Sequence, residues 1–182
     1  MYDAIFKVVV FGDTNTGKTT LRKRFMTNLY DSNCRKTIGV DFQTKDFRYK
    51  EVGIKLMIWD FAGEERFRYM FPQYLYGTMG GILMYDITNY STLSQIDKWL
   101  SLINETNHKF PIILLGSKLD LDDFREISLN DASKVAKSMG LNGCIECSSK
   151  SGENVYRPFE ALTKIMLDRV TIKTGAIPRI ST

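Results

Sequence analysis

The sequence has few of the residues on which disulfide-rich proteins and zinc proteins depend. Its 182 residues include three cysteines and one histidine. Three cysteines are too few for a disulfide framework and suit a reducing compartment, so we expect a cytoplasmic protein. Cys144 and Cys147 form a C-x-x-C pair, but a zinc site would need two more ligands and His108 stands apart from them. We therefore expect no metal or redox role for this pair.

Long hydrophobic runs and a large excess of one charge are also missing. No stretch reaches the roughly 20 apolar residues of a membrane-spanning helix, and the chain does not open with a secretion signal. The 25 basic residues nearly balance the 21 acidic ones, and the net charge of +4 is spread along the chain. This distribution argues against nucleic acid as a partner. We interpret the densest basic run, residues 22–24, as a solvated helix face.

The pattern of apolar residues predicts one α/β domain. A chain of this size can bury about 70% of its unfolded surface in one core, and we expect a domain over residues 1–171 with a short tail over 172–182. Short, nearly uninterrupted apolar runs are typical of buried parallel strands. These runs cover residues 5–11, 56–59, 81–85 and 112–116.

Segments with helical spacing lie between the apolar runs and indicate a doubly wound sheet. Their apolar positions are Leu93, Ile96, Trp99, Leu100 and Ile103, then Ala132, Val135, Ala136 and Met139, then Val155, Phe159, Leu162, Ile165 and Met166. The alternating segment 42–49 predicts an edge strand that turns through residues 51–53 into the next strand. We therefore expect a mostly parallel six-stranded sheet with one antiparallel edge strand and helices on both faces.

A phosphate-binding loop is the most specific motif of the chain. Residues 12–19 spell G-x-x-x-x-G-K-T between an apolar run and a helix-like stretch, 21–28. Backbone N–H groups in such a turn point at a polyphosphate, and the following helix adds its positive N-terminal end. Lys18 would reach the β and γ oxygens, and the Thr19 hydroxyl would coordinate Mg²⁺. The motif predicts a P-loop NTPase fold without naming the base.

Polar residues follow the apolar runs, at the sheet edge where such folds bind ligands. Asp60, opposite the phosphate loop, can hold a metal ion through water. Asp120 can accept two hydrogen bonds from N1–H and the 2-amino group of guanine, whereas adenine offers no matching donors. Because an unpaired buried polar group discriminates by about 10⁴- to 10⁵-fold, guanine is the expected base. A further polar stretch, 146–150, follows the last run.

Four motifs follow one another along the chain: the phosphate loop, the segment that begins with Asp60, the segment that contains Asp120, and residues 146–150. In this order they make the chain resemble the small GTPases of the Ras superfamily, from Phe6 to about Met166. It is most similar to the Rab branch, through residues 36–42, 55–68 and 85–88. The resemblance implies a guanine-nucleotide-dependent switch that binds GTP or GDP with Mg²⁺, hydrolyses GTP to GDP and phosphate, and acts in signal transduction and vesicle trafficking.

The resemblance also implies roles for single residues. Thr19 and Thr37 would ligate Mg²⁺, which Asp60 would support through water. The catalytic set would be Glu64, Lys18, Thr37 and Gly63. The residues implied to contact the nucleotide are Asp13, Thr14, Asn15, Thr16, Gly17, Lys18, Thr19, Thr20, Tyr30, Thr37, Gly63, Ser117, Lys118, Asp120, Ser148, Ser149 and Lys150.

Two loops, 29–39 and 61–75, are expected to be held by contacts to the terminal phosphate and released when it leaves. Effectors, exchange factors and GTPase-activating proteins would bind a surface made of residues 37–42, Trp59 and Tyr74. Phe42, Trp59 and Tyr74 match an aromatic trio that Rab proteins present to effectors, and ordinary core packing is the alternative. We expect a monomer. The tail, 172–182, has no cysteine for a prenyl anchor, so any attachment to membranes is expected to be peripheral, through a partner or a missing tail.

Five residues depart from the family pattern near the chemistry. Glu64 occupies the place of the glutamine that orients the attacking water, which removes an amide donor and adds negative charge beside a phosphate. Thr14 would crowd a partner's arginine. Asn15 replaces a loop glycine, Ser117 replaces an asparagine, and Cys34 replaces a tyrosine. These departures keep a second hypothesis open, a slowly hydrolysing or non-hydrolysing GTP-bound scaffold. A small-molecule kinase is a third, against which Asp120 argues.

Overall fold

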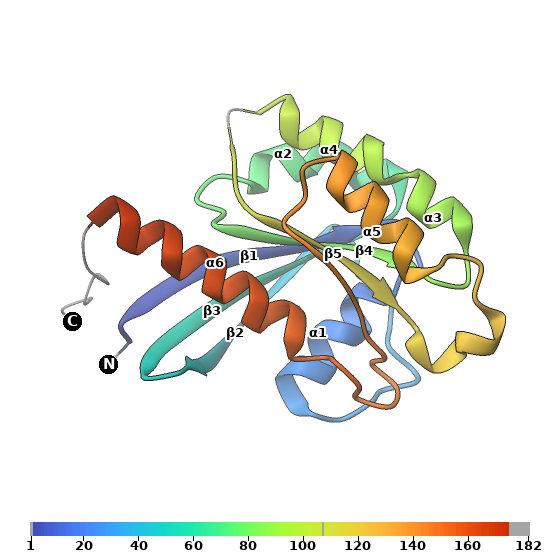
Figure 1. Ribbon diagram of the computed structural model, residues 1–182, viewed down its shortest axis with the longest axis horizontal. Coiled ribbons are helices and arrows are strands. Elements are labelled where there is room, and N and C mark those ends of the chain that lie inside the picture. Colours follow the sequence, from blue (N-terminus) through green and yellow to red (C-terminus); the bar gives the residue numbers. More distant parts are fainter. Residues whose placement is uncertain (1, 107, 175–182) are drawn as a thin grey trace.

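A six-stranded sheet forms the centre of the protein (Figure 1). The computed structural model describes residues 2–106 and 108–174, with side chains given as far as residue 171. The strands lie in the order β2-β3-β1-β4-β5-β6, and β2 alone runs antiparallel to its neighbour. The sheet confirms the predicted architecture. Its strands are β1 (Ala4–Gly12), β2 (Val40–Tyr49), β3 (Val52–Phe61), β4 (Gly80–Asp86), β5 (Ile112–Ser117) and β6 (Cys144–Glu146).

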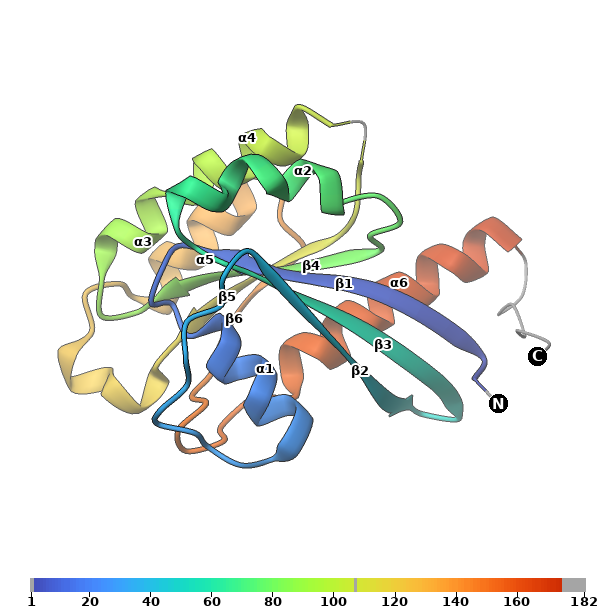
Figure 2. The ribbon, with the colours of Figure 1, turned by 180° about the vertical axis from the view of Figure 1, so that it is seen from behind.

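Helices cover both faces of this sheet, as predicted. Figures 1 and 2 show α1 and α6 on one face, and α2, α3, α4 and α5 on the other. Two short 3₁₀ helices, η1 and η2, lie in the loops that follow β3 and β5. The bounds are α1 (Lys18–Thr27), η1 (Glu65–Met70), α2 (Phe71–Tyr74), α3 (Tyr90–Ser94), α4 (Ile96–Asn104), η2 (Leu119–Phe124), α5 (Leu129–Ser138) and α6 (Arg157–Thr174).

Strand β1 supplies both hydrophobic cores because successive side chains on a strand point to opposite faces. Val8 and Val10 pack toward α1 and α6, where Phe25 stacks on Phe159 with ring centroids 3.8 Å apart. Val9 lies in the core of the other face, with Phe11, Trp99 and the buried residues of α5. This two-sided burial explains why the strands at the centre of the sheet are continuous apolar runs.

Two local predictions were wrong. The hairpin between β2 and β3 turns at Lys50 and Glu51, so Val52 and Gly53 already belong to β3 and pair with Tyr49 and Arg48. The turn types favoured in two-residue hairpins have positive φ at their first central residue, and Lys50 adopts a φ of 54°. Helix α1 spans Lys18–Thr27 rather than residues 21–28. It begins directly after Gly17, the last residue of the phosphate loop, which adopts a left-handed backbone conformation with a φ of 83°.

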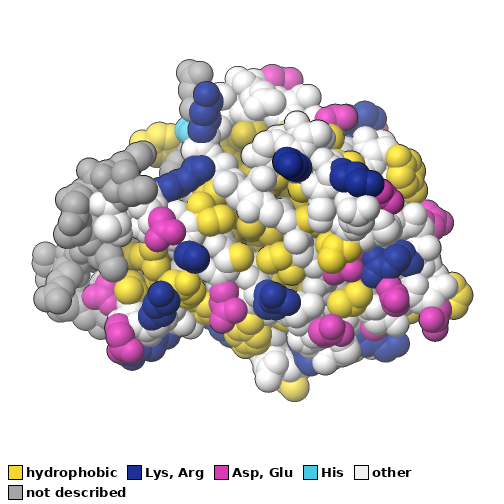
Figure 3. All heavy atoms as spheres, in the orientation of Figure 1, with side chains coloured by type: hydrophobic (Ala, Val, Ile, Leu, Met, Phe, Trp, Pro, Cys, Tyr) yellow, Lys and Arg dark blue, Asp and Glu magenta, His cyan; other side chains and the backbone are white. Residues whose placement is uncertain are grey.

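The surface on the side of α6 carries charges of both signs. In Figure 3, basic and acidic side chains lie interspersed around hydrophobic patches on this face. Within the described ranges, no helix combines the length and apolar content needed to cross a bilayer. Helix α6 continues to Thr174, past the boundary expected at residue 171. Most of the predicted tail, 175–182, lies outside the described residues, and the division into domain and tail stays a prediction.

Candidate nucleotide-binding site

The phosphate loop connects β1 to α1, and three of its residues, Gly12, Asn15 and Gly17, have positive φ. Gly12 has a φ of 135°, and a Cβ there would stand 2.3 Å from the carbonyl oxygen of Met84 on the neighbouring strand. A side chain is therefore excluded at Gly12. Asn15 has a φ of 60°, a conformation that asparagine tolerates better than most residues. The loop can thus curl back toward the start of α1 despite lacking a glycine at this position.

Lys18 lies buried beneath the loop. Its Nζ donates to the carbonyl oxygen of Asp13 at 2.5 Å, and the fully buried Thr16 donates its hydroxyl to the same oxygen at 2.9 Å. Burial lowers the pKa of Lys18 to about 8, against the opposing charges of Asp60 and Asp13. A buried ammonium group that contacts a carbonyl rather than a carboxylate is well placed to pair with an anion.

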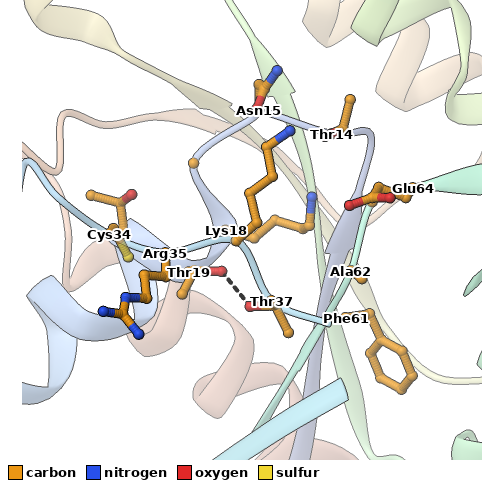
Figure 4. A pocket seen from close by; sticks show the side chains of 14 residues that line it. Thr14, Asn15, Lys18, Thr19, Cys34, Arg35, Thr37, Phe61, Ala62 and Glu64 are labelled. Carbon is orange, nitrogen blue, oxygen red and sulfur yellow. Dashed lines mark hydrogen bonds between the residues drawn. The ribbon is translucent and has the colours of Figure 1, made fainter. Parts of the chain in front are cut away.

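Three oxygen-bearing side chains meet next to Lys18. The hydroxyls of Thr19 and Thr37 lie 2.7 Å apart (Figure 4), and the Thr37 hydroxyl donates to Oδ2 of Asp60 at 3.1 Å. Burial raises the pKa of Asp60, while a hydrogen bond from Thr19 and the charges of Arg22 and Lys18 act in the opposite direction.

The second carboxylate oxygen of Asp60 gives a test of whether this group fits a metal ion. Asp60 is fully buried, and its Oδ1 has no hydrogen-bond partner in the part of the chain that the structure describes. Such an acceptor normally has a partner. Hydroxyl and carboxylate oxygens are the ligands that Mg²⁺ takes, and Mg²⁺ keeps several of its waters. The residues present therefore fit a Mg²⁺ ion, which Thr19 and Thr37 would ligate and Asp60 would hold through water.

A hollow opens above these residues. It is lined by three segments, the phosphate loop and start of α1, residues 34–37, and residues 61–64 (Figure 4). Gly63 closes one side, where a Cβ would stand 2.4 Å from the backbone of Asp13 and Thr14. Of the residues predicted to bind phosphate or to act in catalysis, this hollow brings together Thr14, Asn15, Gly17, Lys18, Thr19, Thr20, Thr37, Gly63 and Glu64.

Glu64 stands on the opposite side of the hollow from Cys34 and Arg35 (Figure 4). Its carboxylate accepts a hydrogen bond from Nε of Arg66 at 2.8 Å. The Glu64 side chain is 30% exposed, so it keeps access to solvent. This ion pair holds the carboxylate in the loop where the resemblance expects a glutamine.

The residues predicted to bind the base do not line the hollow, and those in the loops after β5 and β6 form a second group. Ser148 donates its hydroxyl to Oδ1 of Asp120 at 2.5 Å, and Lys150 Nζ lies 4.0 Å from Oδ2. Lys118 pairs with Asp86 at the end of β4. Ser117 donates to the carbonyl oxygen of Tyr85 at 3.0 Å. Ser149 lies beside Ser148 in the loop after β6, and Tyr30 lies in the loop after α1, 44% exposed.

Two arginines contact the site without having been predicted to do so. Arg68 of η1 places Nη2 3.4 Å from Oδ1 of Asp13. Arg22 of α1 is only 2% exposed, so the expected solvated face at 22–24 is wrong for this residue. A signal for Arg22 exists in the sequence, because Lys18, Leu21 and Phe25 mark the buried face of α1 at helical spacing. No comparable signal points to Arg68, whose partner lies 55 residues away.

The aromatic trio Phe42, Trp59 and Tyr74 forms a continuous row. Phe42 stacks on Trp59 with ring centroids 5.1 Å apart, and Trp59 lies 5.7 Å from Tyr74. Trp59 and Tyr74 are partly buried against the core, whereas Phe42 is 51% exposed. Core packing therefore accounts for part of the row and leaves Phe42 available to a partner.

The C-x-x-C pair does not line the phosphate hollow, although Cys147 directly precedes Ser148 of the predicted base-binding group. Cys144 is half-buried in β6 and Cys147 is fully buried. Burial raises the pKa of both thiols. Among the described residues, no cluster of three or more His, Cys, Asp or Glu side chains is placed to hold a metal ion.

Comparison with known proteins finds similarity over most of the chain. The family model described as Ras family matches residues 7–168. The chain is 40% identical over 172 residues to Ras-related protein Rab-1 of Theileria parva and, equally, of Theileria annulata, covering 93% of this chain and 78% of each relative. It is 35% identical over 170 residues to Ras-related protein SEC4 of Saccharomyces cerevisiae, with the same coverage.

Proposed function

This chain belongs to the Ras family as a Rab-like, GTP-hydrolysing small GTPase, and from that premise we propose how its own residues hold and process the nucleotide. We propose that GTP or GDP binds with Mg²⁺ along the phosphate loop, and that its base reaches Asp120. The observation that carries this proposal is the contact of Thr19, Thr37 and Asp60 directly beside Lys18.

The proposed Mg²⁺ ligands would link the nucleotide to the loop 29–39. Thr37 belongs to the loop 29–39, whereas Thr19 and Asp60 belong to α1 and β3. Mg²⁺, when bound, would neutralise phosphate charge at this point. The Thr37 hydroxyl already contacts Thr19 and Asp60, and a metal ion or phosphate would add a further partner that holds its loop against the site. Loss of the terminal phosphate would remove that added partner and favour release of the loop.

The second segment, 61–75, contacts the phosphate loop through Gly63. The close approach of Gly63 to Thr14 supports a backbone N–H donated to the γ-phosphate. To reverse a two-state population from 1:99 to 99:1, the γ-phosphate must favour one state by about 5.5 kcal/mol. Contacts from Lys18, Thr37 and Gly63 together would supply that free energy.

The base would be read by the loops after β5 and β6. Asp120 is held by Ser148 and approached by Lys150, and its carboxylate would accept hydrogen bonds from N1–H and the 2-amino group of guanine. Lys118 would lie along the base, with Tyr30 at its edge and Ser149 on the far side. Ser117 uses its hydroxyl on Tyr85, so it supports the loop rather than the nucleotide.

Partners would recognise the loops and the exposed aromatic row. Residues 37–42 carry Ile38, 79% exposed, and Phe42, which stacks on Trp59. Exposed aromatic side chains are effective anchors in protein interfaces. We propose that effectors, exchange factors and GTPase-activating proteins bind here, on a monomeric cytoplasmic protein.

The rate of hydrolysis is set by an unusual side chain. Glu64 can accept a hydrogen bond from a water but cannot donate one, and its charge opposes approach to a phosphate. Its ion pair with Arg66 offsets part of that charge. The missing donor and the remaining negative charge of Glu64 favour a slow intrinsic rate, so the GTP-bound form would persist until a partner acts.

Two measurements test the proposal. Chromatography of the nucleotide released by denaturing the purified protein is expected to show GDP or GTP. Single-turnover assays on protein loaded with labelled GTP are expected to show slow phosphate release that depends on Mg²⁺. Recovery of adenine nucleotide, or of none even after incubation with excess GTP and Mg²⁺, would contradict the proposed ligand. Retention of GTP without phosphate release over hours would leave the scaffold as the function.

A further inference from the structure

Arg22 places a positive charge inside the protein, next to the proposed metal site. It lies on the face of α1 that turns toward the sheet, and it is 2% exposed. A buried arginine is rare unless it is paired. Its partners therefore indicate what it does.

Those partners are two carboxylates on adjacent strands. Nη2 of Arg22 lies 2.7 Å from Oδ2 of Asp41, and Nε lies 3.4 Å from Oδ2 of Asp60. Asp41 and Asp60 are direct partners in the register of β2 and β3. Like charges directly opposite each other in a sheet repel. Arg22 lies where it can neutralise this repulsion.

The contact occupies one oxygen of Asp60 and leaves the other available. Both Arg22 and Thr37 use Oδ2, whereas Oδ1 is buried with no hydrogen-bond partner among the described residues. Nη1 of Arg22 is likewise buried and without such a partner. The guanidinium therefore orients the carboxylate and, as a cation, opposes the approach of a second cation.

We propose that Arg22 is a positioning residue that weakens Mg²⁺ binding at Asp60, and that Asp41 limits this effect because it competes with Asp60 for the guanidinium. This inference rests on the proposed function. Asp41 draws the guanidinium toward β2 and away from the metal carboxylate. Because Asp41 is the second residue of β2, the strand that directly follows the loop 29–39, Arg22 also joins that loop to the metal site. The Mg²⁺ concentration needed to retain nucleotide would thus depend on the position of the loop 29–39.

The proposal predicts shifts of opposite sign for two substitutions. Arg22→Met removes a positive charge beside Asp60, so Mg²⁺ should bind more tightly. Asp41→Asn removes the competing carboxylate, so Arg22 should pair more strongly with Asp60 and Mg²⁺ should bind less tightly. If Arg22 only packed the core, both substitutions would loosen the site and shift the Mg²⁺ requirement in the same direction.

The experiment is a Mg²⁺ titration of nucleotide retention. Each variant is loaded with a fluorescent GDP analogue, and its dissociation rate is followed by fluorescence against free Mg²⁺ set with a chelator. The Mg²⁺ midpoint is expected to fall by about tenfold in Arg22→Met and to rise by about threefold in Asp41→Asn. Arg48→Met is the matched control, because the Arg48 side chain is 72% exposed at the far end of the hairpin. Its midpoint should equal that of the parent protein.

Each outcome decides a separate claim. The role of Arg22 would be overturned if the Mg²⁺ midpoints of Arg22→Met and Asp41→Asn both equalled that of the Arg48→Met control. It would also be overturned if both midpoints shifted in the same direction. If circular dichroism shows that Arg22→Met does not fold, the Asp41→Asn midpoint decides, and a value equal to or below that of the parent overturns the role. Failure of the parent protein to retain the GDP analogue at saturating Mg²⁺ would instead overturn the proposed function.

Discussion

Glu64 is the residue through which a single substitution should change the rate of hydrolysis most directly. Glu64→Gln supplies an amide donor and removes a negative charge from the hollow. We expect single-turnover hydrolysis to become roughly tenfold faster, equivalent to about 1.4 kcal/mol in activation free energy. Phosphate release from loaded protein measures this. Glu65→Gln, at the exposed neighbouring position, makes the same chemical change and should have no effect. A slower Glu64→Gln variant would show that the carboxylate itself assists the reaction.

Asp120 should determine which base is bound. Asp120→Asn exchanges a carboxylate oxygen for an amide donor, which suits the 2-carbonyl of xanthine rather than the 2-amino group of guanine. Affinity for GTP is expected to fall by about 10⁴-fold and affinity for XTP to rise, as measured by competition binding. The exposed Asp123 provides the control Asp123→Asn. Unchanged GTP affinity in Asp120→Asn would refute the assignment of base recognition.

Cys147 should make stability depend on alkaline pH. Burial, reinforced by the charges of Asp120 and Glu146, raises the pKa of this thiol to about 12 from an ordinary value of 9.0. The folded form stays protonated while the unfolded chain ionises, so the stabilising contribution is complete below about pH 9 and is lost as the pH rises toward 12. The loss approaches about 1.4 kcal/mol per pH unit.

Urea unfolding at about pH 8 and about pH 10 tests this linkage. The free energy of unfolding should fall less over this interval in Cys147→Ala than in the parent protein. Cys34→Ala, at a loop position that is half-buried, should behave like the parent. An equal fall in all three proteins would mean that other groups cause the alkaline loss.

At the scale of elements, the segment after β3 has to lie against the phosphate loop, and Gly63 is what permits this. In Gly63→Ala, the added Cβ would stand 2.4 Å from the amide nitrogen of Thr14, so one of the two segments must shift. We expect affinity for GTP to fall by about tenfold while affinity for GDP changes little, because Gly63 is proposed to contact only the γ-phosphate. Equilibrium titrations with both nucleotides measure this, and GDP serves as the internal control. Equal losses for both would indicate a general collapse of the loop.

The sequence predicted elements better than it predicted their ends. Continuous apolar runs marked β4 and β5 because these strands are covered on both faces. The hairpin turn was misplaced because Lys50 and Glu51 are not typical turn residues, and the register of β2 against β3 decides where the chain reverses. The start of α1 depends on the left-handed Gly17, a backbone conformation that apolar spacing does not reveal.

At the scale of the whole molecule, ligand binding should stabilise the domain, since the site joins β1, α1, β3 and the loop 29–39. GDP with Mg²⁺ at about 1,000 times its dissociation constant adds about 4 kcal/mol to the free energy of unfolding. For a chain of this length, that raises the melting temperature by about 8–16 °C. Differential scanning calorimetry with ADP and Mg²⁺ as the control tests this. An equal shift with ADP would contradict guanine selectivity.

The sequence by itself determined the phosphate loop, the alternation of strands and helices, and the carboxylate expected to read the base. These features are local, because each depends on residue types within a short stretch of chain. Only the tertiary structure decided that Arg22 lies between Asp41 and Asp60, that Arg68 reaches Asp13, and that Phe42 stacks on Trp59. Those contacts join residues 17 to 55 positions apart, so they depend on how packed elements bring side chains together, which local sequence does not specify.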